Sequence, residues 1–212
     1  ISASPTTILA DGTSTSTVTV TLLDANGNPT GTSGGLVVVA TDLGTVGATT
    51  DLGDGTYSAV LTSAQTAGTA TVSFTLDGAG APATAPVVFT AGAVDLGSST
   101  IEADPATLTA DGVSTSTVTV RLSDLNGNPL TTSGGTVVIA TDAGTVGATT
   151  DVGDGTYTAE LTSPTTAGTA TLSFTLDEGV GEQTASVDFV PGAADPGASS
   201  IEASPTSITA DG

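Results

Sequence analysis

Ser16-Thr17-Val18-Thr19-Val20-Thr21-Leu22 alternates threonine with apolar side chains. Successive side chains of a β-strand point to opposite faces, so this period of two predicts a strand with one apolar face. The β-branched residues on both faces favour the same structure. The stretch returns at 116–122 as Ser-Thr-Val-Thr-Val-Arg-Leu. The sequence therefore predicts the same strand in two places.

The repetition extends over the whole chain with a period of 100 residues. The opening Ile1-Ser-Ala-Ser-Pro-Thr-Thr-Ile-Leu-Ala-Asp-Gly12 has counterparts at 101–112 and 201–212, and 201 − 101 equals 101 − 1. A repeat without gaps means that one folding unit is used more than once. We expect a first repeat at 1–93, a linker at 94–100, a second repeat at 101–193, a linker at 194–200 and the truncated start of a third repeat at 201–212. The sequence is thus expected to be a segment of a longer array.

Each repeat carries about seven short stretches with strand periodicity. In the first repeat we expect strands at 6–10, 16–22, 36–41, 45–49, 56–61, 68–76 and around Val87 and Phe89. Turn-forming Gly, Asp, Asn and Pro separate them, and no stretch has helical periodicity. The pattern predicts an all-β fold, with an antiparallel β-sandwich in each repeat.

The composition is acidic and lacks several reactive residues. The 212 residues include 22 Asp and Glu, a single basic residue, Arg121, and no His, Cys, Met or Trp, so the formal charge is −21. Such a surface repels phosphate backbones and anionic lipids, so we expect neither nucleic acid binding nor membrane contact by this fragment. Without His, Cys or Lys, catalytic triads, thiolate nucleophiles and Schiff bases are excluded. We therefore expect no enzyme activity.

The few aromatic side chains are expected in the core. All six fall on the inward faces of predicted strands: Tyr57, Phe74, Phe89, Tyr157, Phe174 and Phe189. Burial is the usual place for such residues, so packing is favoured over an aromatic platform for a sugar.

Metal binding stays open because oxygen ligands are abundant. Asp24-Ala-Asn-Gly-Asn28 resembles the first half of a calcium-binding EF-hand loop, but the closing Glu is absent, so a hairpin-type turn is favoured. If the sandwiches stack end to end, we expect carboxylates to converge where they meet. These are Asp11, Asp42, Asp95, Glu102, Asp104, Asp124, Asp151, Asp154 and Asp177. Either they spread into solvent or a Ca²⁺ ion bridges some of them. No other cofactor is expected.

Four motifs in order resemble the bacterial immunoglobulin-like (Big) repeats of the invasin and intimin adhesins. They are Ala10-Asp-Gly12, Ser16-Thr-Val-Thr-Val-Thr-Leu-Leu-Asp-Ala-Asn-Gly-Asn-Pro29, Gly53-Asp-Gly-Thr-Tyr-Ser-Ala-Val-Leu-Thr62 and Ala67-Gly-Thr-Ala-Thr-Val72. Filamin repeats share the Gly-Asp-Gly-Thr-Tyr turn. The resemblance covers nearly the whole of both copies. It implies tandem immunoglobulin-like sandwiches outside a bacterial cell, at its surface.

On this resemblance we expect a non-enzymatic stalk or spacer of a surface adhesin, which projects a distal binding region and contributes to cell adhesion. The expected partners are the neighbouring repeats of the chain, and a host or surface receptor bound by a domain not present here. Two alternatives stay open. One is a structural or lateral-packing domain of a surface filament, surface layer or phage particle, and the other is a direct glycan- or protein-binding module.

Overall fold

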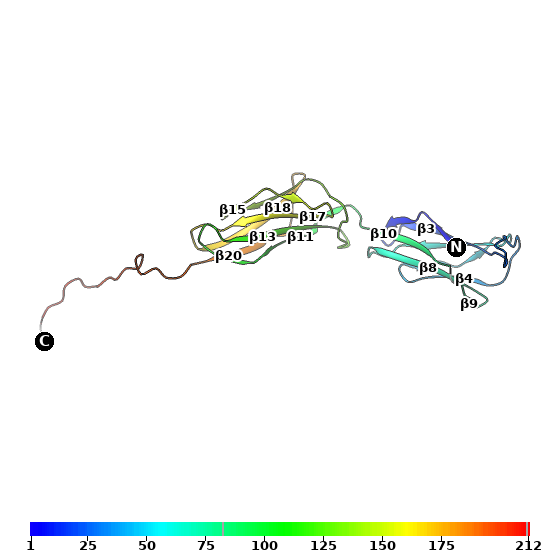
Figure 1. Cartoon of the computed structure of the whole chain (residues 1–212), viewed down its shortest axis with the longest axis horizontal. Helices are drawn as coiled ribbons and strands as arrows, with labels where there is room; N and C mark the ends of the chain where they lie inside the picture. Colours follow the sequence, from blue (N-terminus) through cyan, green and yellow to red (C-terminus); the bar gives the residue numbers. More distant parts are fainter. Residues whose placement is uncertain (82, 211) are drawn as a thin grey trace.

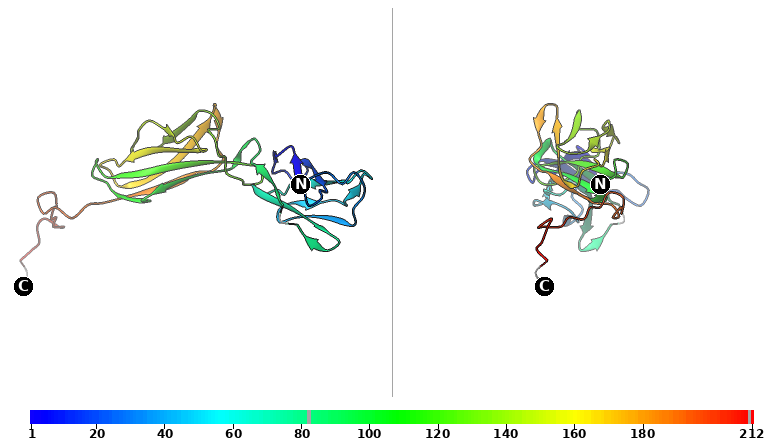
Figure 2. Two further views of the ribbon diagram at one scale, coloured as in Figure 1. Left: turned by 45° about the vertical axis from the view of Figure 1, so that its right-hand side comes forward. Right: turned by 90° about the vertical axis from the view of Figure 1, so that its left-hand side faces the viewer.

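The structure is a computed structural model that describes residues 1–81, 83–210 and 212. Two β-sandwiches follow one another along the long axis, and an extended C-terminal segment continues from the second (Figure 1). The same succession is visible after a turn of 45° (Figure 2). Among the described residues, no helix has the length and apolarity of a membrane span. The prediction of an all-β fold is confirmed.

Within the described residues, ten strands build the first sandwich. One sheet has the order β1-β3-β7-β5, with β6 also paired to β7, and the other has the order β2-β10-β8-β4, with β9 also paired to β8. The strands are β1 Ser2–Ser4, β2 Thr7–Leu9, β3 Thr15–Thr21, β4 Val37–Thr41, β5 Thr45–Val46, β6 Thr50–Asp51, β7 Thr56–Thr62, β8 Gly68–Leu76, β9 Ala79–Gly80 and β10 Ala85–Thr90.

The second sandwich repeats this topology with β11-β13-β17-β15 and β12-β20-β18-β14, to which β16 and β19 are added at β17 and β18. Its strands are β11 Val94–Asp104, β12 Thr107–Thr109, β13 Thr115–Asp124, β14 Val137–Thr141, β15 Thr145–Val146, β16 Thr150–Asp151, β17 Thr156–Thr162, β18 Gly168–Leu176, β19 Gly179–Val180 and β20 Ala185–Val190.

One strand pair in each sandwich departs from the antiparallel expectation. β2 runs parallel to β10, and β12 runs parallel to β20. The reason is that the opening segment crosses between the sheets: β1 pairs with β3 in one sheet and β2 pairs with β10 in the other. Pro5 lies between them, where a residue without an amide donor ends the first pairing.

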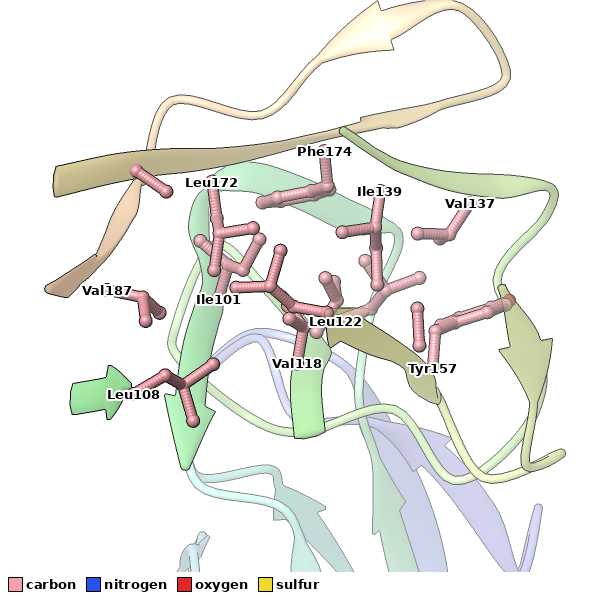
Figure 3. Packing of buried hydrophobic residues seen from close by; sticks show 14 of the residues in the cluster. Ile101, Leu108, Val118, Leu122, Val137, Ile139, Tyr157, Leu172, Phe174 and Val187 are labelled. Atoms are coloured by element: carbon pink, nitrogen blue, oxygen red, sulfur yellow. The ribbon is translucent and has the colours of Figure 1, made fainter. Parts of the chain in front are cut away.

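The apolar faces of the two sheets meet in one core per repeat. In the second repeat, Val118 and Leu122 of β13 lie across from Leu172 and Phe174 of β18 (Figure 3). In the first repeat, Val18 and Val20 of β3 and Ala59 and Leu61 of β7 are buried in the same way. Five of the six aromatic side chains are buried, whereas Phe74 is only half-buried. The prediction of a core that holds the aromatics is confirmed except at Phe74.

The two segments expected to be linkers differ from each other. Residues 94–100 are the first part of β11, which pairs with β13, so this segment is a strand and not a loose connection. Residues 191–210 carry no strand and are exposed. The opening of a repeat pairs with strands of the β3 and β10 type, and no such strands follow residue 201 in this sequence. Asp211, which belongs to the expected third opening, lies outside the described residues.

Candidate functional site at the joint between the repeats

A tight turn at the end of β13, residues 124–128, lies where the two repeats meet, and we call it the joint turn. Asp124 Oδ1 accepts hydrogen bonds from the backbone amides of Asn126 and Asn128, each at 2.9 Å. Asn128 Nδ2 donates to the two carboxylate oxygens at 3.2 and 3.0 Å. Gly127 has φ of +78°, a conformation that glycine adopts without strain. Local bonds of Asp and Asn side chains to backbone therefore build the turn.

The core of the second repeat holds this turn in place. The hydroxyl of buried Tyr157 donates to the carbonyl of Gly135 at 2.8 Å and accepts from the amide of Gly134 at 3.0 Å. These two bonds hold the end of the loop that connects β13 to β14. Leu122, just before the turn, donates its amide to the Gly155 carbonyl at 2.9 Å. A Cβ on Gly155 would lie 2.7 Å from Leu130 Cβ, so this close approach requires glycine. The joint turn is thus anchored from both sides.

Asn128 joins the second repeat to the loop between β7 and β8 of the first. Its Nδ2 donates to the Gln65 carbonyl at 2.8 Å, and its Oδ1 accepts from the Ala67 amide at 2.7 Å. The side-chain amide therefore pairs with one donor and one acceptor of the same loop. Asn128 is only 6% exposed, so solvent has little access to these bonds.

Two further hydrogen bonds reach two other loops of the first repeat. Asn126 Nδ2 donates to the Ala10 carbonyl at 3.1 Å, in the loop between β2 and β3. The Gly92 amide, between β10 and β11, donates to Asp124 Oδ2 at 2.8 Å. In all four bonds the first repeat supplies a backbone atom and the second supplies a side chain. Contacts to three separate loops restrain both bending and rotation about the joint.

The connecting strand adds apolar contacts to these bonds. Val94 pairs with Asp124, and Val94 and Leu96 pack against the core of the second repeat. The ladder then bulges between Asp95 and Thr100. Ser99, fully buried in this bulge, donates its hydroxyl to the Asp95 carbonyl at 2.8 Å. The connection between the repeats is thus part of the second sandwich.

The first repeat has its own copy of the joint turn, residues 24–28, which we call the outer turn. Asp24 Oδ1 accepts from the amides of Asn26 and Asn28 at 2.9 Å each, as in the joint turn. Asn28 Nδ2 lies 3.3 and 3.1 Å from the two Asp24 oxygens. The local geometry is the same, but the outer turn is exposed throughout. Contact with another repeat therefore buries Asp124 and Asn128 without reshaping the turn.

Both turn aspartates have a lowered pKa. For Asp124, burial alone raises the pKa, but hydrogen bonds from the Asn128 side chain, the Gly92 amide and the amides within the turn outweigh it. For Asp24, the amide and side chain of Asn28 and then the amide of Asn26 lower the pKa. The carboxylate form is the one that accepts these bonds, so the joint is built for the ionised state.

The loops that receive the joint turn, residues 10–13, 63–67 and 90–93, are also shaped by an aspartate, and we call them the receiving loops. Asp11 accepts bonds from the amides of Thr13 and Ser14 at 2.8 and 2.6 Å. It also accepts from the Ser63 hydroxyl at 3.2 Å, which ties two of these loops together. The bonds from the Ser14 amide, the Ser14 hydroxyl and the Thr13 amide hold the pKa of Asp11 well below its ordinary value.

Most of the carboxylates expected to converge at the joint instead bind backbone amides of their own repeat. Asp11 and Asp124 line one small pocket together. The other bonds are Asp42 to Thr71 at 2.6 Å, Asp95 to Ser98 at 2.8 Å, Asp151 to Gly153 at 2.8 Å, Asp154 to Thr156 at 3.0 Å and Asp177 to Thr136 at 2.8 Å. Amide donors thus neutralise much of the repulsion that the sequence suggested.

The expected position of Glu102 and Asp104 at the joint is wrong. They pair with Thr119 and Thr117 of β13, which are five and seven residues from Asp124 (124 − 119 and 124 − 117), or about 17 and 23 Å along the strand. Within residues 1–81, 83–210 and 212, no group of three or more acidic residues is placed to hold a metal ion. The calcium bridge stays one of the two alternatives that the sequence leaves open.

Sequence reasoning placed Asp124 among the carboxylates at the joint, but it did not identify Asn126 or Asn128 as part of the site. The turn itself was expected at 24–28, and the structure has a turn there and at 124–128. A signal was present: Asp, Asn and Asn recur in both copies, whereas Leu23 and Ala25 beside them change to Ser123 and Leu125. The atoms of the first repeat that bind this turn gave no such signal, because every one of them belongs to the backbone.

Comparison with known proteins assigns both repeats to the same family. The sequence matches the family described as Invasin, domain 3, over residues 1–92 and 95–192. The structure of Yersinia pseudotuberculosis InvD is 29% identical with a TM-score of 0.66 and matches 94% of this chain. Invasin, described as a bacterial integrin-binding protein, is 33% identical over 89% of the chain with a TM-score of 0.59. The Escherichia coli adhesin FdeC is 27% identical over 91% with a TM-score of 0.63.

These relatives are longer than the present chain. The match covers 59% of the InvD structure, 39% of the invasin structure and 63% of the FdeC structure. The chain therefore spans less than two thirds of each, and corresponds to a part of such a protein.

Proposed function

Because the chain belongs to the invasin domain 3 family, whose members are not enzymes, we propose that it is an extracellular spacer in the stalk of a bacterial surface adhesin. Its task is to hold a binding region at a fixed distance and direction from the cell. Recognition of a receptor is assigned to another domain of the adhesin. The integrin binding named for invasin belongs to that protein.

The observation that carries this proposal is the joint. Four hydrogen bonds connect the joint turn to three loops of the first repeat, and Val94 and Leu96 pack the connecting strand against the second core. A flexible linker between two binding modules would need none of these contacts. A spacer needs them, because bending at each joint would return the tip toward the cell.

The shape and charge of the repeats suit the same task. β18 has nine residues, which is about 30 Å of strand, so each repeat with its loops adds on the order of 40 Å. The charge of −21 makes neighbouring stalks repel each other and stay separate. Burial of five aromatic side chains leaves few of the groups that direct recognition of a sugar or protein commonly uses.

Display on a bacterial surface tests the proposal. The chain is placed between a membrane anchor and a peptide tag, and adhesion to tag-binding beads is measured through a polymer layer that covers the anchor. We expect adhesion with the tag, none without it, and less adhesion when Asn128→Ala loosens the joint. Adhesion to host cells without any tag would contradict a spacer and favour a direct binding module.

A further inference from the structure

In each repeat, a strand near the start and the last strand lie side by side and run in the same direction. β2 pairs in parallel with β10, with Thr7 opposite Val88 and Leu9 opposite Thr90. β12 pairs in the same way with β20 in the second repeat. We call these two pairs the parallel ladders. The chain enters each ladder by one of its strands and leaves by the other.

Backbone hydrogen bonds extend each ladder beyond the paired residues. The amide of Val88 donates to the Thr6 carbonyl at 2.9 Å, and the amide of Ala10 donates to the Thr90 carbonyl at 2.8 Å. The second repeat has the same two bonds, from Asp188 to Ala106 at 2.9 Å and from Ala110 to Val190 at 2.8 Å. Because these groups are backbone, the ladder is kept although the side chain of Val88 is replaced by a carboxylate.

The joint shows in which direction the strands of the first ladder run. β2 leads to Ala10, whose carbonyl accepts from Asn126 at 3.1 Å, and β10 leads to Gly92, whose amide donates to Asp124 at 2.8 Å. Both strands therefore run toward the joint, and the chain enters β2 at Thr6, at the opposite end of the repeat. The long strands also follow the long axis of the molecule (Figure 1).

Tension between the ends of the chain therefore loads the ladder along its strands. It draws β2 away from the joint and β10 toward the joint, so the two strands would have to slide past each other. The hydrogen bonds of the ladder then share the load and must break together, whereas strands that are peeled apart lose their bonds one at a time. The rate of forced unfolding depends on this barrier.

The core adds to the resistance of the ladder. Ile8 of β2 and Phe89 of β10 lie opposite each other and are only 8% and 1% exposed, so sliding would also bring apolar surface into water. β1 is loaded before β2, but its release from β3 would free only the residues that precede Thr6. The ladder of β2 and β10 would still hold the rest of the repeat.

We propose that the parallel ladders bear the load when the chain is stretched between its ends. This role goes beyond the proposed spacer function, which concerns distance and direction. It belongs to each repeat by itself, so the ladder resists tension whatever precedes or follows the repeat. A stalk of such repeats keeps its length when an object bound at its tip is pulled by flow.

Optical tweezers test the proposal on the full chain, because two introduced cysteines are the only thiols to which handles can attach. With Thr6→Cys and Ala93→Cys, the force slides β2 along β10. With Thr6→Cys and Thr84→Cys, the force acts at the neighbouring starts of the two strands and peels them apart. All three positions are exposed. We expect the sliding pair to unfold at about twofold or higher force than the peeling pair.

A substitution within the ladder gives a second test in the sliding pair. Val88→Pro removes the amide that donates to the Thr6 carbonyl, and the unfolding rate at a fixed force should rise about 2- to 10-fold. Gly47→Pro is the matched control, because it removes one backbone bond, from Gly47 to the Val60 carbonyl at 2.9 Å, outside the ladder. It should leave this rate unchanged.

An equal or lower unfolding force for the sliding pair than for the peeling pair overturns the proposal. An unchanged rate in Val88→Pro overturns it as well, and so does an equal rise in Gly47→Pro. If Val88→Pro does not fold, the comparison of the two cysteine pairs still decides, because it leaves the ladder intact. None of these results bears on the proposed spacer function, which the display experiment judges separately.

Discussion

Replacement of Asn128 by alanine tests whether the joint turn holds the two repeats together. The change removes the bonds of Asn128 to the Gln65 carbonyl and the Ala67 amide, and those to Asp124 within the turn. Asn28→Ala is the matched control, because Asn28 makes the same bonds to Asp24 in the outer turn and is exposed. The difference between the two variants is the contribution of the joint.

The size of the effect follows from the two lost bonds between the repeats. Each neutral hydrogen bond contributes about 0.5–1.5 kcal/mol net, so Asn128→Ala should weaken the joint by about 1–3 kcal/mol. Since about 1.4 kcal/mol is a factor of ten, the open fraction of the joint should rise about 5- to 150-fold. Asn28→Ala should leave it unchanged.

Amide hydrogen exchange at low protein concentration measures this opening. The Gly92 amide is the best reporter of this opening. Its acceptor, Asp124 Oδ2, is present in both variants, so the amide loses its hydrogen bond and exchanges only when the joint opens. We expect Gly92 to exchange about 5- to 150-fold faster in Asn128→Ala than in wild type. Equal exchange of Gly92 in the two variants, or an unprotected Gly92 in the wild-type chain, would refute the reasoning.

Three further predictions concern acid, packing and calcium. Hydrogen bonds, led by those from the amides of Ser14 and Val113, lower the pKa of Asp11 and Asp111 below the ordinary 3.8, so their stabilisation is complete above pH 3.8 and is lost below it. The melting temperature should therefore fall between about pH 4 and pH 2, and a constant value would contradict this. Leu96→Ala should lower the free energy of urea unfolding by about 1–3 kcal/mol, whereas the exposed Leu125→Ala should change it by less than about 0.5 kcal/mol. Calcium at about 2 mM and a chelator should give the same melting temperature, because the carboxylates bind amides, and a rise with calcium would favour the bridging ion that the sequence left open as an alternative.

The strands and their faces could be predicted from the sequence because a half-buried strand has a period of two. β8 was expected at 68–76 and spans Gly68–Leu76, and β4 was expected one residue longer than Val37–Thr41. The exposed Val60 corresponds to Glu160 in the second copy, so a difference between the copies marks an outward position. Local patterns of this kind need no knowledge of the partner strand.

The first half of β11 could not be predicted in this way. Its sequence, Val94-Asp-Leu-Gly-Ser-Ser99, has the Gly, Asp and Ser content of a loop, and it becomes a strand because β13 pairs with it and the core accepts Val94 and Leu96. The place of Glu102 and Asp104 was misjudged for the same reason. A strand carries them away from the joint, where a short linker would have kept them near it.

The candidate site could not be predicted from the sequence either, because half of its hydrogen-bonding groups are backbone atoms. The sequence drew attention to carboxylates and hence to a cation, whereas the acceptors and donors that meet the joint turn are backbone groups of Ala10, Gln65, Ala67 and Gly92. Backbone donors and acceptors are present in almost every residue, so the amino-acid sequence does not show which of them take part in a contact. They become visible only when the two repeats are placed together.

The central claim is that the two repeats form one stiff body, and residual dipolar couplings of the full chain in a weakly aligning medium test it most directly. A rigid joint predicts that a single alignment tensor fits the amides of 1–92 and 101–190 together, in calcium and in chelator alike. Two tensors of different size or direction for the two repeats would mean independent motion about residue 93, and would contradict the account.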